Sequence, residues 1–405
     1  MKLGIIREGK TPPDKRVPFS PAQCAEIINK FDVNLVIQPS PIRAFTDEEY
    51  QKEGVTLQED LSDCDVLMGV KEVNIKDLID GKHYFFFSHT IKKQPYNANL
   101  LKAFLEKKIK ITDYETLTHK EGGRILGFGR YAGIVGAYNG LLAWGKRNGS
   151  FDLKPANQCK DFEEIKIELK KVVLGDAKIV LTGGGRVAQG AVEVMEEVNI
   201  QKVTSSDFIF QEFPTPVYAQ LHCNNLYKSK TGKEFDLKDF FTNPTEYKSR
   251  FKKFTERADI FISCHYWDNK SEILFTEKDT QNEKFNLKVI ADITCDIKGS
   301  VPTTIRPSTI DNPIYGYNTE SGEEGAPFSP SNITIMAVDN LPCELPRDAS
   351  IDFGNALIEN IIPALTIDDS TNIIDRASIT KNGKLNTGYE YLSLIHISEP
   401  TRLGM

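Results

Sequence analysis

The sequence predicts an α/β protein made of two Rossmann-like, doubly wound parallel-sheet domains with an interdomain cleft. The first observation is that short apolar runs alternate with helical patterns through the first third of the chain. The second is a strand, a glycine-rich turn and a helix start that follow one another from Lys178. The third is the length of 405 residues, which is enough for two domains.

The first domain is expected to contain five strands separated by helices. Ser20 is the expected N-cap of the first helix, with Pro21 at the first helical position. The predicted strands cover residues 3–6, 33–37, 65–70, 84–87 and 109–112, and the predicted helices cover residues 21–31 and 97–107. This alternation favours a parallel sheet, and we assign residues 1–140 together with residues 340–392 to this domain.

Polar residues follow the predicted strands of this domain at the points where the apolar runs end. They are Arg7, Glu8, Lys71, Glu72, His89 and Glu115. In an open α/β sheet the carboxyl ends of the strands form the ligand crevice, so these side chains are candidates for a site. The alternative for each single residue is an ordinary solvated charge at a strand end.

The second domain is assigned to residues 141–339, after a glycine-rich stretch at 122–140 that is expected to lead into a long helix. Residues 211–257 are rich in charged and aromatic side chains, and we interpret them as an insertion. Further strands are predicted at 259–263, 288–293 and 333–338. A helix from Asp348 to about Leu365 is expected to pack back on the first domain.

The turn after the strand at Lys178 fits the G-x-G-x-x-A form of the dinucleotide fingerprint. Gly183 allows a tight turn, Gly185 lets the backbone approach a pyrophosphate, and Ala188 permits close packing of helix and strand. Arg186 and Val187 open the helix, whose N-terminus favours phosphate. The alternative is a structural turn without a ligand.

The preference between NAD and NADP depends on the residue at the end of the next strand. In NAD enzymes this residue is an acid that binds the ribose 2′-hydroxyl. Val203 is followed by Thr204 and Ser205, and an acid comes only at Asp207. Thr204 and Ser205 are therefore candidate cofactor-binding residues. Because an acid at the strand end would repel a 2′-phosphate, its absence favours NADP slightly over NAD, and Lys202 or Arg186 could contact that phosphate. The alternative is that Asp207 turns back to the ribose, as in an NAD enzyme.

Composition excludes several classes of protein. The net charge of −7 disfavours a nucleic-acid or anionic-membrane partner, and no apolar run reaches the length of about 18 residues that a spanning helix needs. Seven scattered cysteines without a C-x-x-C pair fit a reducing, cytoplasmic location and no metal site. Residues 393–405, including His396, look like a non-native tail and are left out of the fold prediction.

Beyond the fold, the chain resembles the lysine-forming saccharopine dehydrogenases and, more closely, the lysine–ketoglutarate reductase module of the aminoadipic semialdehyde synthases. These families are relatives of alanine dehydrogenase. The resemblance runs from Leu3 to about Leu365 and is carried by Leu67-Met-Gly-Val-Lys-Glu72, Phe86-Phe-Ser-His-Thr-Ile-Lys92, Ile111-Thr-Asp-Tyr-Glu115 and residues 7–21, 128–133, 244–251, 291–296 and 338–350. No saccharopine-cleaving module follows, so we expect a stand-alone enzyme or a truncated chain.

The resemblance implies the reversible, NAD(P)-dependent condensation of lysine with 2-oxoglutarate to saccharopine. Lys71 and His89 match the acid–base pair of the family, and Glu72 and Glu115 match acids that tune it. The other implied site residues are Arg16 and Arg124 for substrate carboxylates and Asp339 and Asn340 beside the nicotinamide and substrate. His265 follows a predicted strand of the cofactor domain and is a candidate for the lining of the nicotinamide pocket, with a structural role as the alternative. Asp292 is a further candidate cofactor-binding residue. Planar arginine suits carboxylates because it can bind them through two parallel hydrogen bonds.

Two other functions stay open at this point. One is oxidative deamination of alanine or another small amino acid, and the other is a non-catalytic nucleotide sensor on the same fold. The presence of both Lys71 and His89 argues against a sensor. The oligomeric state is also open, with a homo-oligomer as one option, and the partners expected are small-molecule substrates.

Overall fold

The computed structural model describes residues 1–396, and within it the chain divides into two compact units. Unit 1 consists of Met1–Phe128 and the segment from Pro346 onward, and unit 2 consists of Gly129–Leu345. The boundary expected at residue 140 falls inside the helix α4 (Gly129–Asn148), all of which belongs to unit 2. The tail expected at 393–405 lies mostly outside the described residues, which end at 396.

Unit 1 is built on an eight-stranded sheet in the order β18-β17-β6-β5-β4-β1-β2-β3. The six strands from β3 to β6 are parallel, whereas β17 pairs antiparallel with β6 and β18 pairs antiparallel with β17. The strands are β1 (Lys2–Ile5), β2 (Asn34–Ile37), β3 (Thr56–Leu57), β4 (Val66–Met68), β5 (His83–Phe86), β6 (Lys110–Asp113), β17 (Ser378–Lys381) and β18 (Lys384–Leu385).

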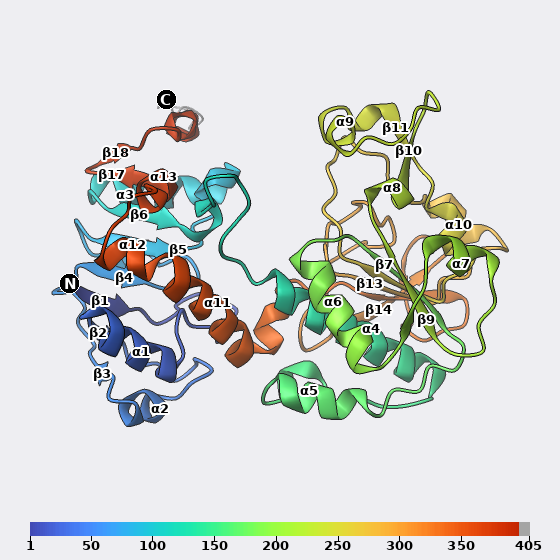
Figure 1. Ribbon diagram of the computed structural model, residues 1–405, viewed down its shortest axis with the longest axis horizontal. Coiled ribbons are helices and arrows are strands. Elements are labelled where there is room, and N and C mark those ends of the chain that lie inside the picture. The colour runs from blue at the N-terminus through green and yellow to red at the C-terminus, as the bar shows by residue number, and fades with distance from the viewer. Residues whose placement is uncertain (397–405) are drawn as a thin grey trace, which may run out of the picture. The chain divides into compact units, whose positions relative to one another are not determined.

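The helices of unit 1 begin where local sequence signals place them. Ser20 caps α1 through a capping box with Gln23, and Pro21 occupies the first helical position as expected. The helices are α1 (Pro21–Phe31), α2 (Asp47–Lys52), α3 (Ala98–Glu106), α11 (Pro346–Asn360), α12 (Ile362–Thr366) and α13 (Ile373–Ala377). Figure 1 shows α11, α12 and α13 in the colours of the chain's end beside the N-terminal strands of unit 1.

Helix α11 returns to unit 1, as the sequence predicts. The Gln23 side chain donates hydrogen bonds to the Ile351 carbonyl at 2.8 Å and to Asn355 Oδ1 at 2.7 Å. Phe353 is 1% exposed and stacks on Phe128 with ring centroids 4.6 Å apart. The C-terminal segment therefore completes the core of the N-terminal domain.

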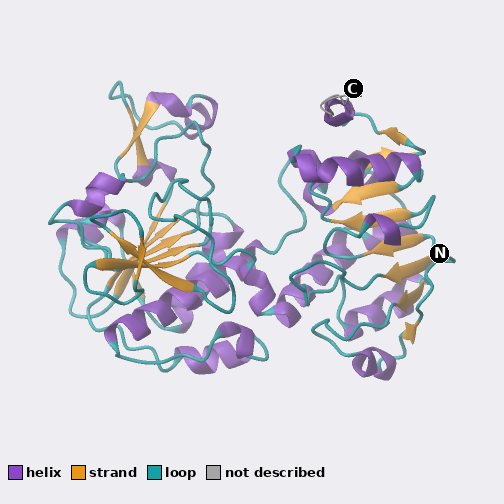
Figure 2. Cartoon of the chain, turned by 180° about the vertical axis from the view of Figure 1, so that it is seen from behind, coloured by secondary structure: helices purple, strands orange, loops and turns teal. Residues whose placement is uncertain are grey.

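Unit 2 contains a second eight-stranded sheet in the order β15-β14-β16-β13-β12-β7-β9-β8. Its strands are parallel except at the β16–β14 and β14–β15 pairs. The strands are β7 (Lys178–Thr182), β8 (Gln201–Lys202), β9 (Val217–Leu221), β12 (Ile260–Ser263), β13 (Val289–Asp292), β14 (Ile314–Asn318), β15 (Glu324–Gly325) and β16 (Asn332–Met336). Both units thus have the predicted α/β architecture, and Figure 2 shows helices flanking the strands of each.

The helices of unit 2 pack closely on one another because glycines remove side chains at their contact. A Cβ on Gly133 of α4 would overlap the Val187 carbonyl, and a Cβ on Gly190 of α6 would overlap the Arg130 carbonyl. Glycines of the predicted glycine-rich stretch therefore serve helix packing. Besides α4, the helices are α5 (Phe162–Leu169), α6 (Arg186–Glu197), α7 (Ser205–Phe210), α8 (Cys223–Leu226), α9 (Leu237–Thr242) and α10 (Lys252–Thr255).

The segment predicted as an insertion at 211–257 begins later than expected. Its first strand, β9, lies inside the sheet as the direct neighbour of β7. After β9 the chain forms a small lobe made of α8, α9 and an antiparallel hairpin of β10 (Tyr227–Ser229) and β11 (Tyr247–Ser249). Figure 1 shows this lobe projecting from the rest of unit 2.

Candidate active site

A cluster of charged side chains lies at the carboxyl ends of β4, β5 and β6 in unit 1. His89 stands between two carboxylates, with Nε2 at 3.8 Å from Glu72 Oε1 and Nδ1 at 3.5 Å from Glu115 Oε2. Lys92 Nζ lies 3.2 Å from His89 Nδ1 and 3.5 Å from Glu115 Oε2. The structure therefore brings His89, Glu72 and Glu115 together, as their positions after parallel strands predicted.

Asp113 fixes the two loops that carry His89 and Glu115. Its Oδ2 accepts hydrogen bonds from the Ser88 amide at 2.9 Å and from the Ser88 hydroxyl at 2.5 Å. Its Oδ1 accepts from the Glu115 amide at 2.7 Å. Since Asp113 is fully buried, these bonds hold His89 and Glu115 in register with the end of β6. Burial raises the pKa of Asp113 even though these donors lower it.

The backbone at His89 takes a conformation that non-glycine residues adopt rarely. Its φ is 54°, in the left-handed region, and its carbonyl accepts a hydrogen bond from Asn97 Nδ2 at 3.1 Å. The imidazole stacks on Phe87 with ring centroids 6.1 Å apart. A backbone in this region, held by a side chain and an aromatic contact, is typical of functional sites.

The surroundings of Glu115 favour its ionised form. Burial alone would raise the pKa of its carboxyl, but the hydrogen bond from His89 and the charges of Lys92 and Arg124 outweigh burial and lower the pKa to about 2. Arg124 Nη2 donates to Glu115 Oε1 at 2.7 Å, and the arginine side chain is 58% exposed. Arg124 therefore keeps an accessible guanidinium at the edge of this cluster.

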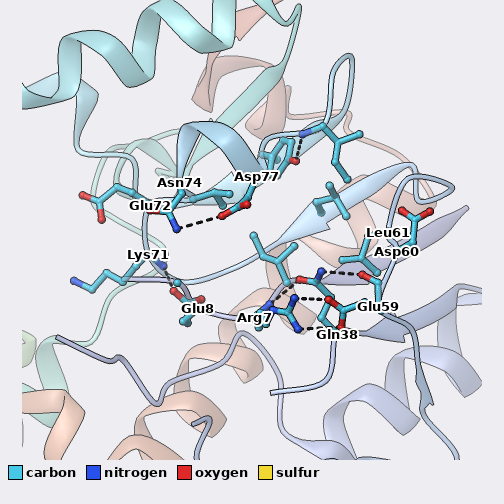
Figure 3. Close-up of a pocket in the computed structure, with 16 residues that line it drawn as sticks. Arg7, Glu8, Gln38, Glu59, Asp60, Leu61, Lys71, Glu72, Asn74 and Asp77 are labelled. Carbon is cyan, nitrogen blue, oxygen red and sulfur yellow. Dashed lines mark hydrogen bonds and ion pairs between the residues drawn. The ribbon is translucent and has the colours of Figure 1, made fainter. Parts of the chain in front are cut away.

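Glu8 supports the segment that carries Lys71 and Glu72. Its carboxylate follows β1 and accepts a hydrogen bond from the backbone amide of Val70 at 2.6 Å. It also accepts one from the backbone amide of Lys71 at 2.9 Å (Figure 3). Withdrawal from water raises the pKa of Glu8 to about 8, although both amide donors lower it. Lys71, Glu72 and Glu8 line a cavity of about 320 Å³ at the carboxyl ends of β1 and β4, where the strand order reverses.

Arg16 is buried rather than solvated. Its guanidinium donates to both carboxylate oxygens of Asp14, from Nε to Oδ1 at 3.0 Å and from Nη2 to Oδ2 at 2.6 Å, and it lies over the Phe128 ring. Burial opposes ionisation of Asp14, but the Arg16 hydrogen bonds and charge lower its pKa to about 2. The contact of Arg16 with a substrate carboxylate stays a prediction.

In unit 2 the predicted glycine turn has the geometry that a pyrophosphate requires. Gly183 has a φ of 97°, and a Cβ there would lie 2.9 Å from the Cys264 carbonyl oxygen, so only glycine fits. Gly185 is the N-cap of α6, has no side-chain cap and faces open space at its Cβ position. Arg186 is exposed and Ala188 is buried. These residues fit a dinucleotide at the N-terminus of α6.

The expected strand before Thr204 exists as β8, but it lies at the edge of the sheet and not beside β7, so Thr204 and Ser205 do not follow the strand next to the glycine turn. The strand beside β7 is β9, which ends at Leu221 and is followed by His222 and Cys223. Thr204 instead caps α7, and its hydroxyl donates to Asp207 Oδ2 at 2.8 Å. Ser205 Oγ does accept a hydrogen bond from Asn225 Nδ2 at 3.2 Å, which links it to the residues after β9.

The other predicted residues of unit 2 differ in accessibility. Asp292 is fully buried and accepts from the hydroxyls of Thr294 and Thr304 at 2.7 and 2.6 Å, so its carboxylate orders the loop after β13 and is not free to contact a cofactor. His265 is 7% exposed and lines a small cavity. Asp339 is exposed, and Asn340 has a φ of 70° in the loop after β16.

The sequence did not point to Asp113 or Lys92 as parts of the cluster. Asp113 is the last residue of β6, and Lys92 belongs to the same block as His89. A buried acid at a strand end and a lysine three residues after a histidine were the available signals. Within residues 1–396 there is neither a helix that could cross a membrane nor a group of side chains arranged to hold a metal ion.

The family model for the alanine dehydrogenase/PNT N-terminal domain matches residues 4–135. These residues are similar to the N-terminal domain of that family. The match begins within β1, covers β2 to β6 and includes every charged residue of the cluster described above. It confirms the superfamily that the motifs after the first-domain strands indicated.

Longer similarities support the same assignment. The chain is 27% identical to alpha-aminoadipic semialdehyde synthase of Arabidopsis thaliana, over 98% of this chain and 42% of that protein. It is 26% identical to the saccharopine dehydrogenase (NAD(+), L-lysine-forming) of Neurospora crassa, over 89% of each. The chain spans about half the length of the synthases that it matches. These similarities confirm the resemblance found in the sequence.

A solved structure of L-alanine dehydrogenase shares the fold. It superposes with a TM-score of 0.66 and 15% identity, covering 98% of this chain and 99% of that chain. At this level of identity the match shows the α/β fold, and the chemistry has to be argued from the residues.

Proposed function

We propose that the protein is an NAD(P)-dependent oxidoreductase of the saccharopine dehydrogenase type, which joins lysine to 2-oxoglutarate by reduction of an imine. The observation that carries the proposal is His89, held between Glu72 and Glu115 in a region similar to the N-terminal domain of the alanine dehydrogenase/PNT family. The dinucleotide turn at Gly183–Gly185 of unit 2 and the names of the relatives support it.

The reaction needs groups that move protons at the amine nitrogen and at the carbonyl oxygen, which leaves as water. Attack of the ε-amine of lysine on the keto carbon forms a carbinolamine, and loss of water gives the imine. His89 is suited to give and take these protons because imidazole changes charge near neutral pH. Lys71, on the segment held by Glu8, is proposed as its partner. Bound NAD(P)H would supply the hydride that reduces the imine.

Recognition of the substrates requires partners for several carboxylates. The exposed guanidinium of Arg124 is proposed to bind one of them, because arginine binds carboxylates through two parallel hydrogen bonds. The same role is proposed for Arg16. Glu115, whose pKa is lowered, accepts a hydrogen bond from Arg124 and would orient its guanidinium and repel a misplaced carboxylate.

The cofactor is proposed to be NADP rather than NAD. The residues after β9 are His222, Cys223, Asn224 and Asn225, so no carboxylate stands at the position that would repel a 2′-phosphate. The preference for NADP thus rests on the end of β9 rather than on the Thr204–Ser205 segment.

A spectrophotometric assay tests the function. NADPH consumption should require lysine and 2-oxoglutarate together, and the Lys71→Met/His89→Gln double variant should lose at least about 100-fold in kcat, as expected for general acid–base groups. The exposed pair Lys76→Met/His119→Gln in the same unit is the control and should keep wild-type turnover. Consumption with pyruvate and ammonia alone would instead support an alanine dehydrogenase activity.

A further inference from the structure

The cavity of about 320 Å³ in unit 1 extends away from the cluster around His89. Its wall is formed by the ends of β1 and β4 and by the loops after β2, β3 and β4. Neither His89 nor Glu115 is among the residues that line it. Figure 3 shows the side chains of Lys71 and Glu72 directed away from the loop that carries Asp60. Most of the cavity is therefore separate from the candidate acid–base groups.

The position and size of this cavity suit a small ligand. The chain passes from β1 to β2 and β3 on one side of β1 and then returns to β4 on the other side. Ligands of open α/β sheets bind at the carboxyl ends of the strands where the strand order reverses in this way. Since a water occupies about 30 Å³ in the liquid, the cavity has room for about ten waters or a ligand of about seven to ten non-hydrogen atoms.

Glu8 brings to this cavity a carboxyl that lacks a cationic partner. It accepts hydrogen bonds from two backbone amides, but within residues 1–396 it forms no salt bridge. Arg16, whose charge lowers the pKa of Glu8, is itself paired with Asp14. Withdrawal from water outweighs these effects and raises the pKa of Glu8 to about 8. Because an ionised carboxylate withdrawn from water is costly unless a cation pairs with it, a positively charged ligand would complete this end of the cavity.

Two further carboxylates line the solvent-exposed part of the cavity. Asp60 follows β3 and Asp77 follows β4, and both are exposed. Asp60 accepts hydrogen bonds from Ser62, and Asp77 accepts one from Asn74 at 3.3 Å. Among the described residues neither carboxylate is paired with a cation, so both are available to a positively charged group of a ligand.

The rest of the wall favours a cationic ligand with an apolar stem. Arg7 is the one arginine among the lining residues, and its charge is already matched by the ion pair with Glu59. It therefore offers little to an anionic ligand. The apolar side chains of the wall are Ile6, Leu61, Leu67, Val73 and Ile79. Such side chains suit the methylene groups of an alkyl chain.

We propose that this cavity is a second ligand site of the protein, which binds a linear alkyl diamine in its doubly protonated form. One ammonium group pairs with Glu8, the methylene chain contacts the apolar wall, and the other ammonium group lies beside Asp60 and Asp77. Because Glu8 also holds the amides of Val70 and Lys71, the diamine stabilises the backbone that carries Lys71. The site goes beyond the proposed function and does not depend on saccharopine formation.

Isothermal titration calorimetry of the full chain with 1,5-diaminopentane, without substrates or cofactor, tests the site. The wild type should bind one diamine per chain. The Asp60→Asn/Asp77→Asn variant should bind it about tenfold more weakly, because two exposed ion pairs are lost. The matched control is Asp63→Asn/Asp80→Asn, which removes two exposed carboxylates of the same loops that do not line the cavity and should bind as the wild type does. Absence of binding to the wild type, or equal affinity of the two double variants, would overturn the proposal.

The choice of amine separates this cavity from the reacting site. Butylamine has one ammonium group and should bind more weakly than 1,5-diaminopentane. Lysine, the substrate of the proposed reaction, carries a carboxylate that the acids at the exposed part of the cavity would repel. Its affinity should therefore be the same in the wild type and in Asp60→Asn/Asp77→Asn. If this variant weakens lysine binding as much as diamine binding, the cavity belongs to the reacting site and the proposal is wrong.

Hydrogen exchange measured by mass spectrometry locates the bound diamine. In the wild type, 1,5-diaminopentane should slow amide exchange in residues 58–62 and 69–79, which contribute to the wall, and leave residues 87–92 unchanged. Protection of residues 87–92 alone would place the diamine at the acid–base cluster and overturn the assignment. Glu8→Gln keeps an acceptor for the amides but has no charge, so it should lose the diamine-dependent protection. Unchanged protection in Glu8→Gln would show that Glu8 does not bind the ammonium group.

Discussion

Glu8 is the residue whose removal should affect the candidate site most selectively. It bridges the end of β1 to the amides of Val70 and Lys71, so it sets the path of the backbone from which Lys71 and Glu72 project. A side chain that accepts from two successive amides fixes two backbone groups that would otherwise need water. We regard Glu8 as a positioning residue for Lys71.

We predict that Glu8→Ala lowers the free energy of unfolding by about 1–3 kcal/mol, since it removes the acceptor of two amides. Turnover should fall by more than the loss of folded protein accounts for. The kcat should change by a larger factor than the KM for the cofactor. Glu8→Gln keeps one carbonyl acceptor and should recover part of kcat. The control is Glu59→Gln, which breaks the exposed ion pair with Arg7 in the same cavity and should change stability by less than about 0.5 kcal/mol. Equal kcat in Glu8→Ala and Glu59→Gln would contradict the prediction.

Glu344 gives the protein a pH-dependent stability that does not involve the site. It is 3% exposed, and Oε1 accepts a hydrogen bond from Asn139 at 2.9 Å. Burial raises its pKa to about 8, so the folded protein holds a proton that the unfolded chain releases near pH 4.5. Between these two values the unfolded state binds fewer protons, and stability falls as the pH rises.

The Glu344→Gln variant should therefore become more stable than the wild type as the pH rises from about 5 to about 9. One pKa unit corresponds to about 1.4 kcal/mol. The raised pKa of Glu344 therefore limits the change in relative stability over this pH range to a few kcal/mol. Thermal unfolding of both proteins across this pH range measures the effect. A difference in Tm that stays constant with pH would show that Glu344 does not titrate as described.

At the scale of elements, the glycines of unit 2 have two separate tasks. Gly133 permits the contact of α4 with α6, because a Cβ would overlap the Val187 carbonyl. Gly185 has open space at its Cβ position and a φ of −84°, which any residue can adopt. Packing therefore requires the first glycine, whereas folding does not require the second.

We predict opposite outcomes for the two alanine variants. Gly133→Ala should lower the free energy of unfolding by about 3 kcal/mol, which is the upper end of the destabilisation that overpacking usually causes. Gly185→Ala should keep wild-type stability but bind NADPH at least about tenfold more weakly, because its methyl group occupies the approach of the pyrophosphate. Thermal unfolding and isothermal titration calorimetry measure the two effects. A loss of stability in Gly185→Ala would show that Gly185 is also needed for folding and would contradict the prediction of two separate roles.

The elements show which features a sequence reveals. Helix α1 matched its prediction because the capping box of Ser20 and the proline at the first position act within one turn. The partner of β7 was missed because pairing is not local. The two-residue strand β8 and the helix α7 precede β9 in the chain, and only the completed sheet shows that β8 is at the edge. The antiparallel strands β14 and β17 were also not predicted, since each is defined by a partner distant in sequence.

The candidate site was predictable to a similar degree. Parallel strands bring their carboxyl ends together, so His89, Glu72 and Glu115 could be grouped from the sequence pattern alone. The hydrogen bonds by which Asp113 holds Ser88 and Glu115, and the burial of Asp292, could not be predicted. Both depend on which side chains face inward at a strand end. The sequence therefore indicated the candidate reacting groups better than the residues that position them.

At the scale of the whole molecule, unit 2 is continuous in sequence and unit 1 is not. Unit 2 has its own core around Phe251, Phe261 and Ile335, whereas the core of unit 1 includes Phe353 and Leu357 from α11. A domain that keeps its whole core in one segment can fold without the rest of the chain.

We therefore predict that a fragment of residues 129–345 unfolds cooperatively and retains NADPH binding. A fragment of residues 1–128 should remain largely unfolded, because it lacks α11 and the β17 partner of β6. Circular dichroism during thermal unfolding distinguishes the two. A cooperative transition in the 1–128 fragment would show that α11 is dispensable for this core.

The antiparallel pairing of β6 with β17 also affects the order of events on the ribosome. Roughly 250 residues separate these strands, and at about 5–20 residues per second their synthesis takes on the order of tens of seconds. Unit 2 can fold during that interval, while the edge of β6 still presents unpaired backbone groups to other nascent chains. The need for chaperones and the aggregation during expression should therefore depend on the first 128 residues. Shortening the C-terminal segment, or slowing its translation, should increase both.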